Sequence, residues 1–151
     1  MTTFPFSLEI AKKDKITSIS LRATPSSCTS ETEKAVINAW LNKSTNIESL
    51  IDLDKISEFQ KKVLLHLRTL KHNETTTYSE IAKAIGHPGA ARAVGSALAK
   101  NPYLLIFPCH KAIRRDGGLG NFSCQATSRE DAINLKKSLI QYEGQYNEQR
   151  T

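Results

Sequence analysis

The chain has 151 residues, a length that suits one compact domain or two small lobes sharing a core. Hydrophobic residues make up 39% and charged residues 24%, the balance of an ordinary globular protein. No apolar run approaches the roughly 20 residues of a membrane helix, and the N-terminus lacks the basic start and apolar core of a secretory signal. We therefore expect a cytoplasmic protein, or a nuclear one in a eukaryote, without a membrane partner.

The formal net charge of +6 is unevenly distributed along the chain. Residues 1–60 contain 7 Lys and Arg against 8 Asp and Glu, whereas residues 61–151 contain 14 against 7. A polyanion such as DNA is the natural candidate partner for the basic part. The alternative is a solvated basic surface without a specific partner.

Three cysteines, Cys28, Cys109 and Cys124, stand at irregular spacing, and the four histidines are scattered. An odd number of cysteines in a reducing compartment argues against a disulfide framework. The chain has no Cys-x-x-Cys pair, so we predict no zinc or other metal site. A single reactive thiol is the simpler hypothesis.

The first predicted elements are strands. Residues 7–22 are β-rich on both sides of the polar turn KKDK and predict two short strands, and residues 24–31 predict a loop. Ser30 and Glu33 then form a capping-box pattern, which predicts a short helix. Residues 43–54 show no clear period, and we interpret them as a link between two lobes.

The second half of the chain has a helical pattern. Apolar residues recur every three or four positions from Ile56 to Leu70, as in an amphipathic helix. Thr77 and Glu80 form a second capping-box pattern, before a short helix that ends at Gly86. After a tight turn, AARAVGSALAK predicts another helix. Two short helices around such a turn have the length of a helix-turn-helix.

A continuous apolar run, residues 103–107, follows these helices and predicts a buried strand or extended segment. Residues 114–128 are rich in Gly and Ser and predict a loop. We expect the last helix to begin near Ser128 and to end near Glu143 and Gly144, with a frayed polar tail.

Cys109 is the first candidate for chemistry, because it follows the apolar run directly and precedes His110. A thiol becomes a strong nucleophile as the thiolate, which a nearby base favours. Neighbouring residues of an extended chain point in opposite directions, so a water molecule or a helical turn would have to join the two side chains. The alternative is a buried, inert cysteine.

The second of the two short helices has an unusual surface. A recognition helix for the major groove displays long polar side chains, but here only Arg92 and Lys100 are long and charged. Small residues allow a close approach to DNA and suit a minor-groove, sequence-tolerant binder with one inserted side chain. The alternative is a small-residue helix packed in the core.

Five motifs follow one another between Thr77 and Ser123. They are Thr77-Tyr78-x-x-Ile81-Ala82, Ala91-Arg92-Ala93-Val94-Gly95, Asn101-Pro102, Ile106-x-Pro108-Cys109-His110 and Gly120-Asn121-Phe122-Ser123. With these motifs the stretch resembles the O6-alkylguanine-DNA alkyltransferases, and residues 1–54 resemble a shortened form of that family's N-terminal α/β lobe. The resemblance implies an α+β fold, in which residues 55–151 form a mostly helical C-terminal domain with a winged helix-turn-helix-like motif and the active site.

The resemblance also implies four catalytic roles. Cys109 would accept the alkyl group, and His110 would act as its base through a water molecule. Glu143 would hold and polarise His110. Asn101 would brace the active-site segment against the recognition helix.

Further roles implied by the resemblance concern DNA. Arg92 would fill the gap that the damaged nucleotide leaves. Tyr78 would press on the neighbouring phosphate and donate a hydrogen bond to the departing guanine. Ser123 and the backbone around Phe122 would hold the guanine edge. The expected DNA-binding set is completed by Thr77, Ala91 and Gly95.

The function implied is DNA repair by a single, stoichiometric alkyl transfer from O6-alkylguanine, with O4-alkylthymine as a second candidate base, to Cys109. We expect a monomer that binds double-stranded DNA through the minor groove and needs no cofactor. Elementary chemistry agrees, since a thiolate suits attack on an alkyl carbon and a stacked base must leave the duplex to react. The chain departs from the family at Lys111, usually Arg, and at Cys124-Gln125, usually a pair of small residues.

Three alternatives remain open from the residues themselves. A non-enzymatic, alkyltransferase-like binder of alkylated DNA would carry another residue, typically Trp, in place of Cys109. A helix-turn-helix regulator would read sequence, which the Ala- and Gly-rich helix disfavours. A Cys-His hydrolase would leave the helix-turn-helix unexplained.

Overall fold

The computed structural model describes residues 3–72, 74–116 and 129–150, and within the last helix it describes the side chains of residues 130–146. The chain begins with an antiparallel hairpin of β1 (Ser7–Lys12) and β2 (Ile16–Arg22). This confirms the predicted pair of strands around the polar turn. The buried side chains of β2 anchor the hairpin in the core.

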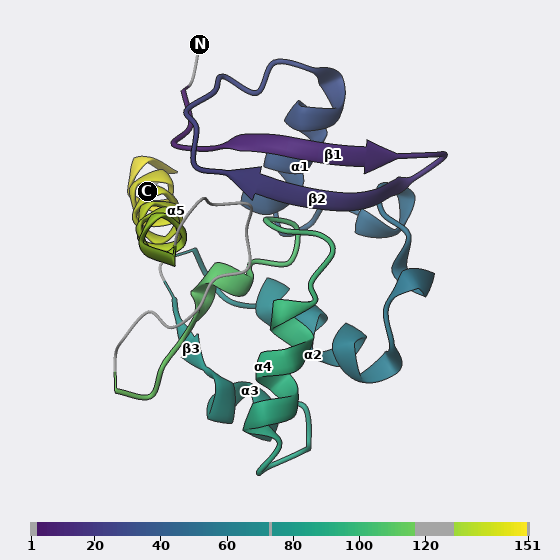
Figure 1. The fold of residues 1–151 in the computed structure, drawn as a ribbon, viewed down its shortest axis with the longest axis vertical. Helices are drawn as coiled ribbons and strands as arrows, with labels where there is room; N and C mark the ends of the chain where they lie inside the picture. Colours follow the sequence, from purple (N-terminus) through teal and green to yellow (C-terminus); the bar gives the residue numbers. More distant parts are fainter. Residues whose placement is uncertain (1–2, 73, 117–128, 151) are drawn as a thin grey trace.

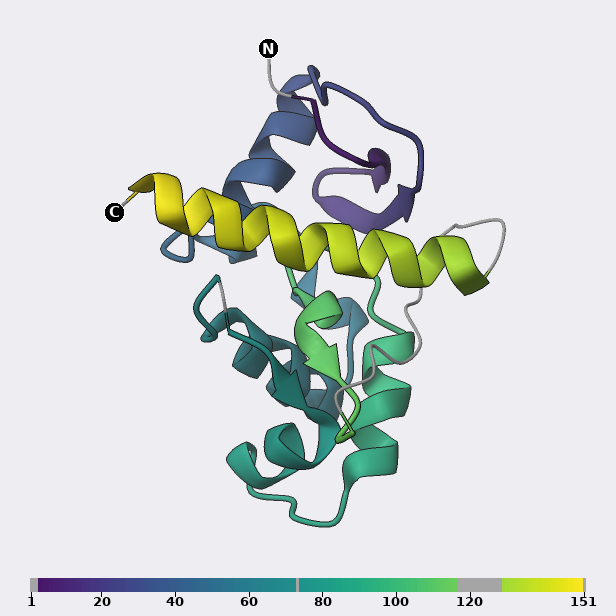
Figure 2. The same cartoon turned by 90° about the vertical axis from the view of Figure 1, so that its left-hand side faces the viewer.

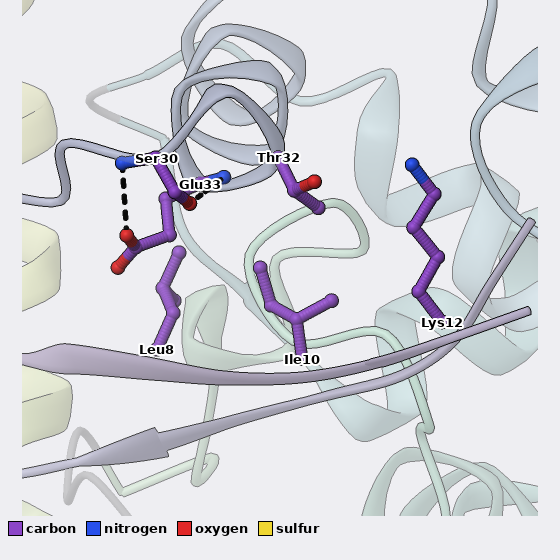
Figure 3. A pocket seen from close by; sticks show the side chains of 6 residues that line it. All are labelled: Leu8, Ile10, Lys12, Ser30, Thr32 and Glu33. Atoms are coloured by element: carbon purple, nitrogen blue, oxygen red, sulfur yellow. Dashed lines mark hydrogen bonds between the residues drawn. The ribbon is translucent and has the colours of Figure 1, made fainter.

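The first helix, α1 (Glu31–Leu41), begins at the predicted capping box. The Glu33 amide donates to Ser30 Oγ, and the Ser30 amide donates to Glu33 Oε1, each at 3.1 Å. Figure 3 shows Leu8 and Ile10 of β1 pointing toward this first turn, where they line a pocket with both capping residues. The last turn of α1 buries Trp40 completely.

The segment that we interpreted as a link is packed against the hairpin. It contains two 3-10 turns, η1 (Ile47–Ser49) and η2 (Leu53–Lys55). The Ile16 amide of β2 donates to Leu50 O at 3.0 Å, and Ile51 is fully buried. Because of these contacts the segment is part of the core and not a flexible linker.

The helical part begins with α2 (Glu58–Arg68), which Ser57 caps at its N-terminus. Thr77 Oγ1 accepts from the Glu80 amide at 3.2 Å and starts α3 (Tyr78–Ala84), as its capping pattern predicts. A turn then leads to α4 (Ala91–Ala99). In that turn Gly86 and Gly89 have φ of +83° and +89°, which favour glycine. The two predicted short helices and their turn are therefore present.

Two very short strands connect the start of α3 with the chain beyond Cys109. β3 (Thr76–Thr77) pairs in parallel with β4 (Ala112–Ile113). The pairing brings Tyr78, the first residue of α3, to the region where Cys109 lies.

Residues 103–107 are buried as predicted, but they form a tight turn instead of a strand. The Phe107 amide donates to Tyr103 O at 3.1 Å, and Leu105 has a φ of +72°. The side chain of Asn101 closes the turn, because its Nδ2 donates to Phe107 O at 3.0 Å and its Oδ1 accepts from the Tyr103 amide at 2.9 Å. The start of the turn also pairs with β2, because the Ile19 amide donates to Pro102 O at 2.7 Å and the Leu104 amide donates to Ile19 O at 3.3 Å.

The last helix, α5 (Arg129–Arg150), is longer than expected. The prediction that it ends near Glu143 and Gly144 is wrong. A glycine inside a helix costs only about 1 kcal/mol, and ring contacts on both sides of Gly144 hold the helix in place. Tyr142 stacks on Trp40 with centroids 5.3 Å apart, and Tyr146 meets His72 at 5.5 Å. The expected start at Ser128 and most of the loop before it lie outside the described residues.

Figures 1 and 2 show how these elements are arranged. The hairpin and α1 lie at one end, α2, α3 and α4 lie at the other, and α5 crosses between them. The buried residues form one cluster that draws on both ends. The architecture is α+β, as predicted, and the division between residues 54 and 55 stays a prediction. Within the ranges described, no helix is long and apolar enough to cross a membrane.

Candidate active site

Cys109 stands at the start of a 3-10 turn, η3 (Cys109–Lys111), directly after Pro108. Its amide donates to Phe107 O at 2.7 Å, and the residue is 6% exposed. The sequence left two ways of relating Cys109 to His110, a water molecule or a helical turn, and the observed backbone is a helical turn. The thiol therefore lies between the turn that Asn101 closes and β4.

His110 forms a buried pair with Glu143. His110 Nε2 lies 3.0 Å from Glu143 Oε1, and both side chains are 1% exposed. An ionised carboxylate can only accept, so this contact requires a proton on Nε2, and in the neutral form of the ring Nδ1 is then the acceptor. This is the tautomer that a histidine needs in order to take a proton on its other side.

Two other groups hold the Glu143 carboxylate. Trp40 Nε1 donates to Oε1, the oxygen that also faces His110, and Lys111 Nζ lies 3.4 Å from Oε2. Burial alone raises the pKa of Glu143, but the charge and hydrogen bond of His110, the charge of Lys111 and the Trp40 hydrogen bond together hold this pKa below its ordinary value. Glu143 is therefore ionised at neutral pH.

Lys111, which stands where the resemblance leads one to expect Arg, is fully buried. Its Nζ donates to Lys71 O at 2.6 Å and to Leu70 O at 3.4 Å, besides facing Glu143. Burial lowers the pKa of Lys111, and the Glu143 charge opposes that effect. Lys43 lies in the same cluster, where burial and the Lys111 charge lower its pKa to about 8. The basic residue after His110 is thus the counter-ion of Glu143.

Asn101 lies where a brace is expected. Its amide donates to Leu98 O at the end of α4, and its side chain closes the turn before Cys109. The residue joins the end of α4 to the active-site segment through three hydrogen bonds.

Tyr78 and Lys136 lie near the thiol. Burial raises the pKa of the half-buried Tyr78, and so does the negative charge of Cys109. Lys136 of α5 is 1% exposed and donates to Ala112 O. Burial lowers its pKa to about 8, and the charge of Cys109 opposes that shift.

Sequence reasoning missed Lys136 and Trp40. A signal for Lys136 was present, since it lies four residues after Ala132 and three before Leu139, within the buried stripe of α5. A lysine in such a stripe is buried by the helix itself. Trp40 carried no comparable signal, because a tryptophan at the end of an amphipathic helix is ordinarily interpreted as a residue of the hydrophobic core.

The expected DNA-binding residues of α4 lie on its outer side. Arg92 is exposed, and Ala91 and Gly95 are partly exposed. The other side of α4 buries Val94, Ala97 and Leu98, so the helix is neither wholly core nor wholly surface.

Gly95 has open space around it, because a Cβ built there would meet no atom within 4 Å. Thr77 is half-buried as the cap of α3. Phe122 and Ser123, expected at the guanine edge, lie outside the described residues. Among the residues that the structure does describe, no three His, Cys, Asp or Glu side chains form a group that could hold a metal ion.

The family model of the 6-O-methylguanine DNA methyltransferase DNA-binding domain matches residues 58–145. The chain belongs to the 6-O-methylguanine DNA methyltransferase family. The matched residues include both short helices, the Cys109 segment and Glu143, and the resemblance drawn from the motifs is confirmed at the level of the family.

Curated relatives of this methyltransferase family agree in name. A methylated-DNA–protein-cysteine methyltransferase of Methanosarcina acetivorans is 41% identical over 88 residues, which are 58% of this chain and 52% of that protein. One from Mycobacterium tuberculosis is 38% identical over 108 residues, which are 71% of this chain and 61% of that protein. The chain thus spans less than two thirds of the length of these relatives.

Two solved structures of the family are similar in fold. The crystal structure of Mycobacterium tuberculosis OGT in complex with DNA has a TM-score of 0.64 and 32% identity, and the match covers 90% of this chain and 85% of that one. The O6-methylguanine-DNA methyltransferase of Pyrococcus kodakaraensis has a TM-score of 0.68 over 92% of this chain and 99% of that one. At 22% identity this second likeness concerns the fold alone.

Proposed function

We propose that the chain repairs double-stranded DNA by transferring the alkyl group of O6-alkylguanine to Cys109 in a single turnover. The observation that carries the proposal is the position of Cys109 directly before His110, whose Nε2 is paired with the buried Glu143 carboxylate at 3.0 Å. O4-alkylthymine is a second candidate substrate, because its alkyl group is attached through the same kind of oxygen.

The reaction that we propose begins with the Cys109 thiol proton. This proton moves through a water molecule to His110 Nδ1, and Glu143 stabilises the imidazolium that forms. The thiolate sulfur attacks the alkyl carbon, an S–C bond forms and the C–O6 bond breaks, and the electron pair stays on guanine. The Tyr78 hydroxyl donates a hydrogen bond to the departing base. Cys109 ends as a thioether, so the protein is consumed.

The base has to enter the site from outside the duplex. Cys109 is only 6% exposed, so a stacked guanine in DNA cannot bring its alkyl carbon to the sulfur. We propose that Arg92, the exposed long side chain of α4, fills the vacated position in the stack. Phe122 and Ser123 are the proposed guanine-edge residues.

The DNA is proposed to approach α4 and the N-terminus of α3 through its minor groove. Thr77, Ala91 and Gly95 lie along that path and have small side chains. The open space at Gly95 supports a close approach, because the fold itself does not require glycine there. We propose a monomer, located in the cytoplasm, or in the nucleus of a eukaryote, where its DNA substrate is found.

The test is a mass measurement after incubation with a duplex that contains one O6-methylguanine. We expect one methyl group per protein, located on the Cys109 peptide, and no gain in Cys109→Ala. Cys28→Ala is the matched control and should react normally, because burial raises the pKa of the Cys28 thiol and disfavours its thiolate. Binding without any mass gain would instead identify a non-enzymatic binder of alkylated DNA.

A further inference from the structure

We propose that Trp40 is a positioning residue for alkyl transfer, through which the N-terminal part of the chain fixes the Glu143 carboxylate and thereby aims His110. The inference rests on the proposed role of Cys109. It assigns a place in the active site to a residue of α1, which precedes the matched family region at residues 58–145 in the sequence.

The geometry at Glu143 is the first argument. Its Oε1 meets two donors, Nε1 of Trp40 and Nε2 of His110, and its Oε2 faces Lys111. A carboxylate with only the His110 contact could rotate about its last side-chain bond. Three contacts from two separate segments, α1 and η3, define the plane of the group.

The packing around the indole is the second argument. Trp40 is fully buried, with its ring stacked on Tyr142 at 5.3 Å and edge-on to Phe6 at 5.9 Å. Its ring also meets His110 at an interplanar angle of 86°, with centroids 6.2 Å apart. The indole is therefore held by a ring just before β1 and a ring of α5, and it touches both members of the His110–Glu143 pair.

The chemistry of the donor is the third argument. An indole N–H donates and cannot accept or titrate, so it stabilises the carboxylate without competing for the proton that moves from Cys109 to His110. Lysine or histidine at this position would add a second titrating group. Trp40 contributes to the low pKa of Glu143 as a neutral partner, alongside His110 and Lys111.

The obvious alternative is that Trp40 is a core residue whose N–H merely finds an acceptor. Trp40→Phe separates the two, because phenylalanine keeps an aromatic ring and removes the donor. Phe6→Leu is the matched control, since Phe6 packs against Trp40 and is fully buried. Each variant is compared by its melting temperature, its affinity for an alkylated duplex, and its Cys109 rate with free O6-benzylguanine and with iodoacetamide from pH 4.5 to 9.

We expect Trp40→Phe to slow both Cys109 reactions about tenfold or more at neutral pH, while the duplex affinity stays unchanged. The pH below which the rates fall should move upward, because Glu143 without its indole donor protonates more readily. Phe6→Leu should lower the melting temperature and leave the rates and their pH profile as they are.

Equal rate losses in the two variants, or a loss in Trp40→Phe with an unaltered pH profile, would overturn the positioning role. Iodoacetamide keeps this test separate from that of the proposed function. If the wild-type protein does not react with benzylguanine, the alkyl transfer fails, and the iodoacetamide profile still decides whether Trp40 acts on Cys109 through Glu143.

Discussion

Replacing Glu143 by glutamine tests whether the buried carboxylate serves the reaction or only the fold. Glutamine keeps the shape and an oxygen that can accept from Trp40 and His110, and it removes the charge that Lys111 faces at 3.4 Å. Breaking one side of a buried pair costs about 3–5 kcal/mol. We expect about 3 kcal/mol here, because Lys71 O and Leu70 O still accept from the Lys111 ammonium. For a chain of this size that loss lowers Tm by roughly 6–12 °C.

The rate effect of Glu143→Gln should be separate from this instability. Without the carboxylate, the imidazolium of His110 loses its partner, and general-base assistance is worth about 10²–10⁴ in rate. We expect the rate with free O6-benzylguanine to fall about a hundredfold, measured at a temperature well below the Tm of the variant. Urea unfolding monitored by tryptophan fluorescence gives the stability of the same samples.

The double variant Lys111→Met/Glu143→Gln distinguishes the two effects. Removing both charges eliminates the unpaired cation, so stability should return to within about 1 kcal/mol of the wild type. The rate should remain low, because His110 still lacks its carboxylate. If the double variant regained the rate together with the stability, Glu143 would have only a structural role, and the reasoning from the His110–Glu143 contact would be refuted.

Two further predictions concern Arg92 and Lys136. Arg92→Ala should slow repair of duplex DNA roughly ten- to several-hundredfold and slow the reaction with free O6-benzylguanine much less, since only in the duplex does a base have to leave the stack. Equal rate losses on both substrates would rule out the role of Arg92 as a side chain inserted into the stack. Because burial lowers the pKa of Lys136 to about 8, the unfolded chain binds more protons than the folded one between about pH 8 and pH 10, and stability should rise with pH in that window. Lys136→Met should reduce this rise, by on the order of 1–3 kcal/mol at pH 10. Part of the rise should remain, because the pKa of Lys43 is also lowered to about 8. Lys137→Met, which replaces an exposed lysine, is the control. Unfolding in urea at several pH values from 7.5 to 10 gives the free energy of unfolding of the wild type and both variants. The same pH dependence in all three proteins would contradict the assignment.

The features that sequence could predict here are local ones. The caps at Ser30 and Thr77 join residues three apart, so their patterns located the starts of α1 and α3. The Cys109–His110 pair and the two short helices are likewise contiguous in the chain. Even the buried state of residues 103–107 followed from their composition.

What sequence could not predict depends on contacts between distant residues. An apolar run can be buried as a strand or as a turn, and here the side chain of Asn101 decides for a turn. The end of α5 was placed too early, because Gly144 looks like a stop and the ring contacts of Tyr142 and Tyr146 are tertiary. The Trp40–Glu143 hydrogen bond joins residues 103 positions apart, and no periodicity reports such a contact.

The position of α5 also bears on when, during synthesis, the proposed site is complete. The ribosome makes Cys109 before Lys136 and Glu143, and both of these reach the thiol region only after α5 has docked against η3 and Trp40. A nascent chain that ends short of residue 143 therefore has Cys109 and His110 without the carboxylate that pairs with His110. Under the single transfer proposed for Cys109, this order of assembly means that the sulfur is made before the groups that would activate it are in place.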